Sequence, residues 1–134
     1  MAPHRILGLN ALVTAGSALG MLAARGTLYT FFGLATPFLL DLLAVGLLAY
    51  AAVVWLATRR PISRQVLMTF TAADALWVVA SALVLVLFWG QLDTIARLLV
   101  IAAAVVVEVF ATLQFLAAGR VVGDSPLSAV GVQR

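Results

Sequence analysis

The chain has 134 residues, of which 65% are hydrophobic and 10% are charged. A soluble domain is close to half apolar and about a quarter charged, so this composition excludes a water-exposed globular protein and indicates an integral membrane protein of one domain. The formal net charge is +3, but the eight arginines are spread along the chain and form no basic patch, so we expect no nucleic-acid partner.

Missing residue types exclude several activities. The chain has no cysteine, which rules out disulfides and thiolate metal sites. It has no lysine to form a Schiff base, and its single histidine, His4, cannot supply a pair of haem ligands. No Ser–His pair or metal-ligand set accompanies the carboxylates. We therefore expect no enzyme activity, no metal and no cofactor, with a bound lipid or hydrophobic small molecule as the one ligand class that the composition suits.

Four apolar runs follow one another along the chain, at residues 6–24, 37–57, 66–89 and 94–118. Each is close to the ~20 residues that a helix needs to cross the hydrocarbon core of a bilayer. Their continuous hydrophobicity, without strict alternation, favours helices over a β-barrel. The predicted fold class is all-α: an integral membrane protein with four transmembrane helices in a compact bundle.

Polar and helix-breaking residues separate these runs. Thr36-Pro37 precedes the second run, with Thr36 expected as the N-cap and Pro37 as the first helical residue. The segment TRRPISR (58–64) separates the second run from the third, and GQLD (90–93) separates the third from the fourth. Residues 119–134 show no apolar period, so we expect a solvated tail there.

The arginines predict the orientation of the chain. In a four-span topology two of them, Arg25 and Arg97, lie on one side of the membrane. The others lie on the opposite side: Arg5, Arg59, Arg60, Arg64, Arg120 and Arg134. Because cytoplasmic segments carry the excess of basic residues, we expect both termini and the central loop in the cytoplasm.

The two halves of the chain resemble each other, as hairpin repeats over about residues 1–60 and 61–120. NALVTAGSAL (10–19) matches DALWVVASAL (74–83), and VGLLAYAAVVWLATRR (45–60) matches VVVEVFATLQFLAAGR (105–120). Chance similarity between Ala- and Leu-rich helices is the alternative, but polar, aromatic and arginine positions match as well. We predict a tandem duplication of a two-helix hairpin, with a pseudo-twofold axis along the membrane normal and with Asn10 and Asp74 at equal depth across it.

Polar residues within the apolar runs gather on single helix faces. We expect them to form a polar seam where the two hairpins meet, able to hold a ligand or a proton. The candidate seam residues are Asp74, Glu108, Trp77, Ser81, Asn10, Thr14, Ser17 and Thr112. Gln114 is expected nearer the inner headgroups.

Asp74 and Glu108 carry the main functional question. An ionised carboxylate at mid-bilayer costs roughly 2.5–3.5 kcal/mol, so both side chains are expected to face the bundle interior. Their similar depth predicts that the two carboxyls approach each other or share one pocket, and with no arginine at that level we expect at least one to carry a proton. The structural alternative is a set of interhelical hydrogen bonds worth about 0.6–2 kcal/mol each. From the sequence, we consider a ligand or proton site and a purely structural set of hydrogen bonds about equally supported for Asp74 and Glu108.

Small residues on the first helix, Gly16, Gly20 and Ala24, form a small-xxx-small ridge that permits close helix packing, either within the chain or between copies. With little soluble mass and no catalytic motif, the chain is interpreted as a structural or accessory subunit that packs with lipids, pigments or a larger membrane complex, or with itself as a homo-oligomer. The alternative function is binding or transport of a small molecule, lipid or proton at the seam around Asp74 and Glu108.

Overall fold

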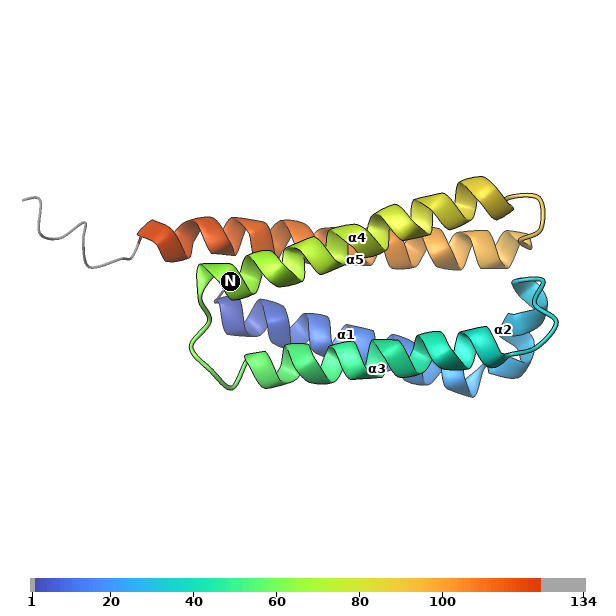
Figure 1. Cartoon of the computed structure of the whole chain (residues 1–134), viewed down its shortest axis with the longest axis horizontal. Coiled ribbons are helices and arrows are strands. Elements are labelled where there is room, and N and C mark those ends of the chain that lie inside the picture. Colours follow the sequence, from blue (N-terminus) through green and yellow to red (C-terminus); the bar gives the residue numbers. More distant parts are fainter. Residues whose placement is uncertain (1, 124–134) are drawn as a thin grey trace, which may run out of the picture.

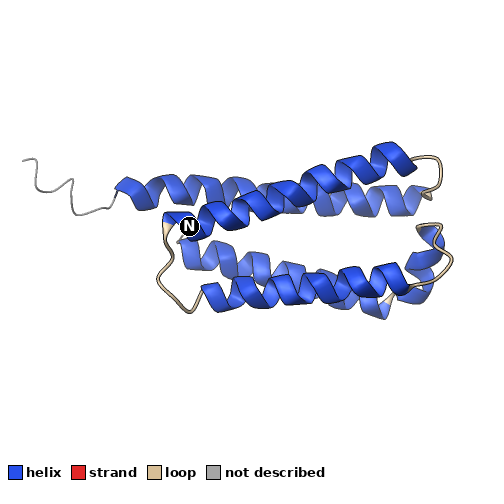
Figure 2. Ribbon diagram, in the orientation of Figure 1, coloured by secondary structure: helices blue, strands red, loops and turns tan. Residues whose placement is uncertain are grey.

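The computed structural model describes residues 2–123 of the chain. This part is helical, and four of its helices are long and apolar enough to cross a membrane, which confirms the predicted all-helical membrane class. Short loops connect the helices (Figure 2). The helices are α1 (Pro3–Ala23), α2 (Arg25–Phe31), α3 (Phe38–Ala57), α4 (Arg64–Phe88) and α5 (Thr94–Gly123).

Three helix boundaries differ from those predicted: the end of the first span, the N-cap of α3 and the end of α5. The segment after the first span forms a second, short helix, α2. Ala24 joins the two helices, and its N–H still donates to the Gly20 carbonyl at 3.0 Å. Pro37, rather than Thr36, is the N-cap of α3, and no side chain caps that helix. α5 continues to Gly123 because a single glycine inside an Ala-rich helix weakens it without ending it. Only the end of the expected tail, residues 124–134, lies outside the described residues.

The long helices form two antiparallel hairpins, α1 with α3 and α4 with α5 (Figure 1). The backbones of the two hairpins approach each other mainly between α1 and α5. The start of α1 and the α3–α4 connection lie at one end of the molecule, whereas α2 and the α4–α5 turn lie at the other (Figure 1). α4 starts at a capped position, where the Ser63 hydroxyl accepts from the Val66 N–H at 3.3 Å.

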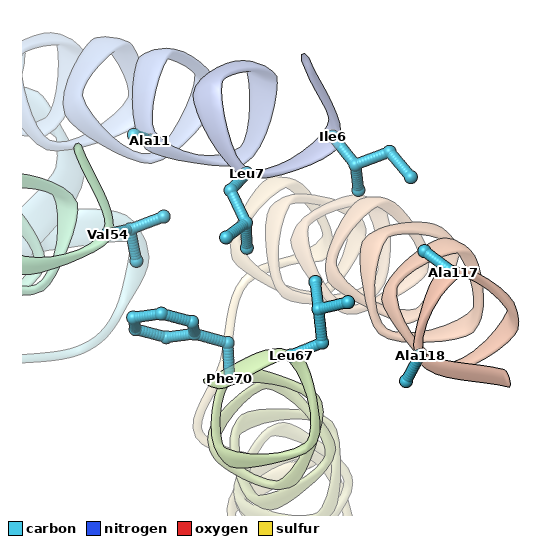
Figure 3. Close-up of a cluster of buried hydrophobic side chains, with 8 residues drawn as sticks. All are labelled: Ile6, Leu7, Ala11, Val54, Leu67, Phe70, Ala117 and Ala118. Atoms are coloured by element: carbon cyan, nitrogen blue, oxygen red, sulfur yellow. The ribbon is translucent and has the colours of Figure 1, made fainter. Parts of the chain in front are cut away.

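An apolar cluster joins the hairpins at the end that carries the start of α1 (Figure 3). All four long helices contribute side chains to it, and Leu7, Val54 and Leu67 are fully buried. The cluster consists of Ile6, Leu7, Ala11, Val54, Leu67, Phe70, Ala117 and Ala118. Outside it, large apolar side chains such as Leu76 and Val86 are 70% and 76% exposed, as expected for a surface that faces lipid.

At the opposite end, the two hairpin turns contact each other. The Asp93 N–H donates to the Phe31 carbonyl at 3.0 Å. Gly33 adopts a φ of 65°, and a Cβ at this position would lie 3.1 Å from the Gln91 carbonyl oxygen. Glycine is therefore required at position 33 both by the left-handed backbone and by the close approach of the α4–α5 turn.

We predict that Gly33→Ala lowers the stability of the folded chain by about 1 kcal/mol or more, because alanine is strained at positive φ and its Cβ would press on the turn. Thermal unfolding in mild detergent measures the effect. Gly26→Ala is the matched control, since Gly26 lies in α2 with negative φ and no atom within 4 Å of an added Cβ. Equal melting temperatures for the two variants would contradict the contact between the turns.

Candidate functional site

Asp74 lies on α4 and points between the two hairpins, with only 4% of its surface exposed. Its Oδ2 atom accepts from the Asn10 side-chain amide of α1 at 2.9 Å and from the Gln114 side-chain amide of α5 at 2.9 Å. Its Oδ1 atom accepts from the Tyr50 hydroxyl of α3 at 2.7 Å. One carboxyl group therefore receives a hydrogen bond from each of the other three long helices.

Further contacts hold these donors in place. The Thr14 hydroxyl donates to Asn10 Oδ1 at 3.2 Å, which orients the amide so that its N–H faces Asp74. The Tyr50 ring packs edge-on against Phe70, with ring centroids 6.0 Å apart and planes at 77°. Together with Gln114, these side chains form what we call the Asp74 cluster: Asp74, Asn10, Thr14, Tyr50 and Gln114.

The cluster contains one unsatisfied atom. Gln114 is fully buried, and its Oε1 has no hydrogen-bond partner among residues 2–123. Over the same residues, no arginine or histidine forms an ion pair with Asp74. The group therefore consists of a carboxyl surrounded by neutral amides and hydroxyls, each of which can either donate or accept after rotation.

The expected seam residues separate into two groups. Asp74, Asn10 and Thr14 come together in the cluster. Ser81 is buried, but its hydroxyl donates to the Trp77 carbonyl of the same helix at 2.9 Å, and Trp77 is half-buried. Ser17 and Thr112 are exposed on the outside of α1 and α5.

Glu108 is also exposed, so the structure does not bring its carboxyl to Asp74. The reason is rotation about the helix axis. Successive residues turn by about 100°, which puts Glu108 roughly 120° around α5 from Gln114, the residue that points into the cluster. Equal depth was a sound expectation, but the inward face of α5 carries Gln114 and small alanines instead.

Gln114 and Tyr50 are the site residues that the sequence analysis missed. Gln114 was expected near the headgroups because the fourth span was ended too early. Measured from Gly123 at about 1.5 Å per residue, Gln114 lies about 14 Å along α5, and Asp74 lies about 15 Å from the start of α4. The small residues Ala111 and Ala118, three positions before Gln114 and four after it, lie on the same face and could have identified it.

Within residues 2–123, the small-xxx-small ridge does not pack closely against another helix. Gly16 and Gly20 are exposed, and a Cβ added at either would meet nothing within 4 Å. Ala24 is the exposed residue between α1 and α2. The close packing of α1 against α3 uses another face, which includes the buried residues Ala11 and Ala18.

An apolar groove of about 260 Å³ lies on the outer side of the first hairpin, and none of its lining residues belongs to the Asp74 cluster. Its walls are Ala11, Leu12, Ala15, Leu48, Ala51, Ala52 and Trp55. Within residues 2–123, no three His, Asp or Glu side chains lie close enough to hold a metal ion. The polar groups thus face one another, and the open groove is suited to a hydrocarbon chain.

Comparison of the chain with protein-family models, with curated proteins and with solved structures gives no match.

We predict a graded loss of stability for substitutions at the cluster. Asp74→Leu leaves the two buried amides and the half-buried Tyr50 hydroxyl without their acceptor and should cost about 2–4 kcal/mol. Asp74→Asn keeps a carbonyl oxygen for the amides and should cost about 1 kcal/mol. Tyr50→Phe removes one hydrogen bond while keeping the ring contact with Phe70, and should also cost about 1 kcal/mol. Thermal unfolding in detergent measures all three.

The order of these variants is the decisive result. If Asp74→Leu unfolds at the temperature of the parent protein, Asp74 is not the acceptor that joins the helices. Leu76→Ala, on the exposed face of the same helix, is the control for a general effect of mutating α4 and should change the melting temperature little.

Proposed function

We propose that the chain is a small non-catalytic membrane scaffold, a structural or accessory subunit that acts through its apolar outer faces. The observation that carries this proposal is the use of the Asp74 carboxyl: donors from α1, α3 and α5 all bind it. The three donors that hold the helices together in this way find their acceptor inside the chain. The outer surface, including the groove lined by Trp55, is left for lipid chains or for the helices of a partner.

A proton-binding function is the second candidate, and one observation favours it. Gln114 Oε1 is buried next to Asp74 and has no hydrogen-bond partner in the described part of the chain, residues 2–123. Rotation of the amide would present this oxygen to a protonated carboxyl, while the Tyr50 hydroxyl can donate to the carboxylate or accept from the acid. The cluster could therefore hold Asp74 in either protonation state without losing its hydrogen bonds.

The rate of proton leakage across a liposome membrane distinguishes the scaffold function from the proton-binding function. We predict that liposomes containing the purified protein dissipate an imposed pH gradient no faster than empty liposomes, because a scaffold offers no proton path. A pH-sensitive dye trapped inside reports the rate, and Asp74→Asn should behave as the parent does. A leak above that of empty liposomes, removed by Asp74→Asn, would favour the proton-binding function and reject the scaffold.

We also propose that the two hairpins arose by duplication. Asn10 and Asp74, the paired positions of the two repeats, bond directly to each other, as two positions beside a pseudo-twofold axis would. Val54 and Gln114, another pair of corresponding positions, are both fully buried. Ser17 and Ser81 do not correspond in this way, since one is exposed and the other buried. Corresponding positions of the two repeats therefore have similar surroundings mainly where the hairpins contact each other.

For orientation, we propose that the end of the molecule carrying the start of α1 faces the cytoplasm. Arg5 belongs to the start of α1 and Arg60 to the α3–α4 connection. Both segments lie at this end of the molecule (Figure 1), and basic residues mark the cytoplasmic side. A cysteine at Pro61 should then react with a membrane-impermeant thiol reagent only from the cytoplasmic side. A cysteine at Gln91, in the opposite turn, should react only from outside. Labelling with the reverse pattern would overturn the orientation.

A further inference from the structure

Glu108 lies in the middle of the apolar length of α5 and is exposed on its outer surface. At about 1.5 Å per residue it is about 21 Å from the start of the helix at Thr94 and about 20 Å from Val121. Arg97 and Arg120, the arginines of this helix, are each more than about 16 Å away along the axis. A single chain therefore presents this carboxyl to the hydrocarbon core, far from any cation of its own helix.

Such a position costs free energy unless a partner covers it. An ionised carboxylate at mid-bilayer costs roughly 2.5–3.5 kcal/mol, and intramembrane ionisable groups are normally found against protein rather than lipid. On α5 itself the Thr112 hydroxyl, one turn away, is the side-chain donor nearest to Glu108, because Gln114 points toward Asp74 instead.

The face of α5 around Glu108 offers one continuous exposed line against which a second helix could pack. Exposed residues are spaced alternately three and four positions apart along it, which is the period of a contact line between two helices. They are Leu98, Ile101, Val105, Glu108, Thr112, Phe115 and Gly119. The two polar members, Glu108 and Thr112, are adjacent at the centre, with apolar residues on both sides, and a central polar pair in such a line fixes the register of the contact.

We propose that this face is where two copies of the chain meet in the membrane, as a parallel pair related by a twofold axis along the membrane normal. A twofold contact brings the same surface of each copy together, so its polar groups must complement themselves. Glu108 and Thr112 do so when Glu108 is protonated, because the two Glu108 carboxyls then no longer repel each other across the axis. The hydroxyl of Thr112 in one copy can donate to the Glu108 carboxyl of the other, and the reverse.

This pairing goes beyond the scaffold function and does not depend on it. The Asp74 cluster lies between the hairpins of one chain, whereas the Glu108 face lies outside them. Loss of pairing would leave the cluster and its effect on unfolding unchanged, and a failure of the scaffold function would leave the pairing intact. The competing surface for self-association is the exposed ridge of Gly16 and Gly20 on α1.

Disulfide cross-linking in liposomes tests the geometry, since the natural chain has no cysteine. Val105→Cys places a thiol on the proposed contact line and keeps both polar residues. Leu76→Cys places one at similar depth on the exposed face of α4, and Ser17→Cys places one on the α1 ridge. After oxidation, Val105→Cys should form dimers at least about tenfold faster than either control, because a disulfide needs Cβ atoms about 4 Å apart. Equal rates, or faster cross-linking of Ser17→Cys, would overturn the proposal.

Substitution of Glu108 tests whether its carboxyl drives the association of the two copies. Glu108→Leu replaces a carboxyl by a lipid-compatible side chain, so it should favour a single chain in lipid and lower the association constant by about tenfold or more. Glu108→Gln keeps an amide that bonds to the Thr112 hydroxyl and should retain most of the association. Energy transfer between labelled copies, diluted stepwise with lipid, measures both. Association of Glu108→Leu at the level of the parent, or a stable complex with a different protein in place of the dimer, would contradict the proposal.

Discussion

The Asp74 carboxyl is the polar contact on which the joining of the two hairpins depends. It accepts from Asn10, Tyr50 and Gln114, and so connects α4 to each of the other long helices. In water such bonds would compete with solvent, but lipid offers no alternative partner, so each donor is better satisfied in the cluster than outside it. Apolar packing beside the cluster excludes lipid from it, and Leu7 and Leu67 are fully buried there.

Several other polar residues make contacts close to their own position in the chain. Thr71 and Ser81 donate to backbone carbonyls one turn earlier in their own helix. At the end with the α4–α5 turn, Arg25 pairs with Asp41 at 2.8 Å, and the Arg97 guanidinium lies 4.6 Å from the centre of the Trp89 ring. These contacts are at the helix ends, where charge and aromatic rings meet the headgroups. The Glu108 carboxyl, in contrast, is exposed in the middle of the apolar length of α5. For this reason we propose its face as the contact with a second chain.

Much of the fold could be predicted because the length and continuity of an apolar run are set by the bilayer. The match between the two halves of the chain predicted equal depth for Asn10 and Asp74, and the structure joins their side chains by a hydrogen bond. Rotation about each helix axis was not predictable, since a helix that is apolar on every side gives no periodic signal for its inward face. For this reason Glu108 was expected to face the bundle interior. Gln114 was missed for a different reason, since the predicted fourth span ended at residue 118 and so placed it too close to the headgroups.

Nuclear magnetic resonance of the side-chain amides measures the central claim most directly. Asn10 is the single asparagine of the chain, so its amide gives one assignable pair of proton signals. The account predicts that the Asn10 and Gln114 amide protons exchange slowly with deuterated water, while those of Gln65 and Gln91, which are exposed, exchange quickly. It also predicts that Asp74→Asn shifts the Asn10 and Gln114 signals. Rapid exchange at Asn10 and Gln114, with no shift in Asp74→Asn, would show that Asp74 does not join the helices.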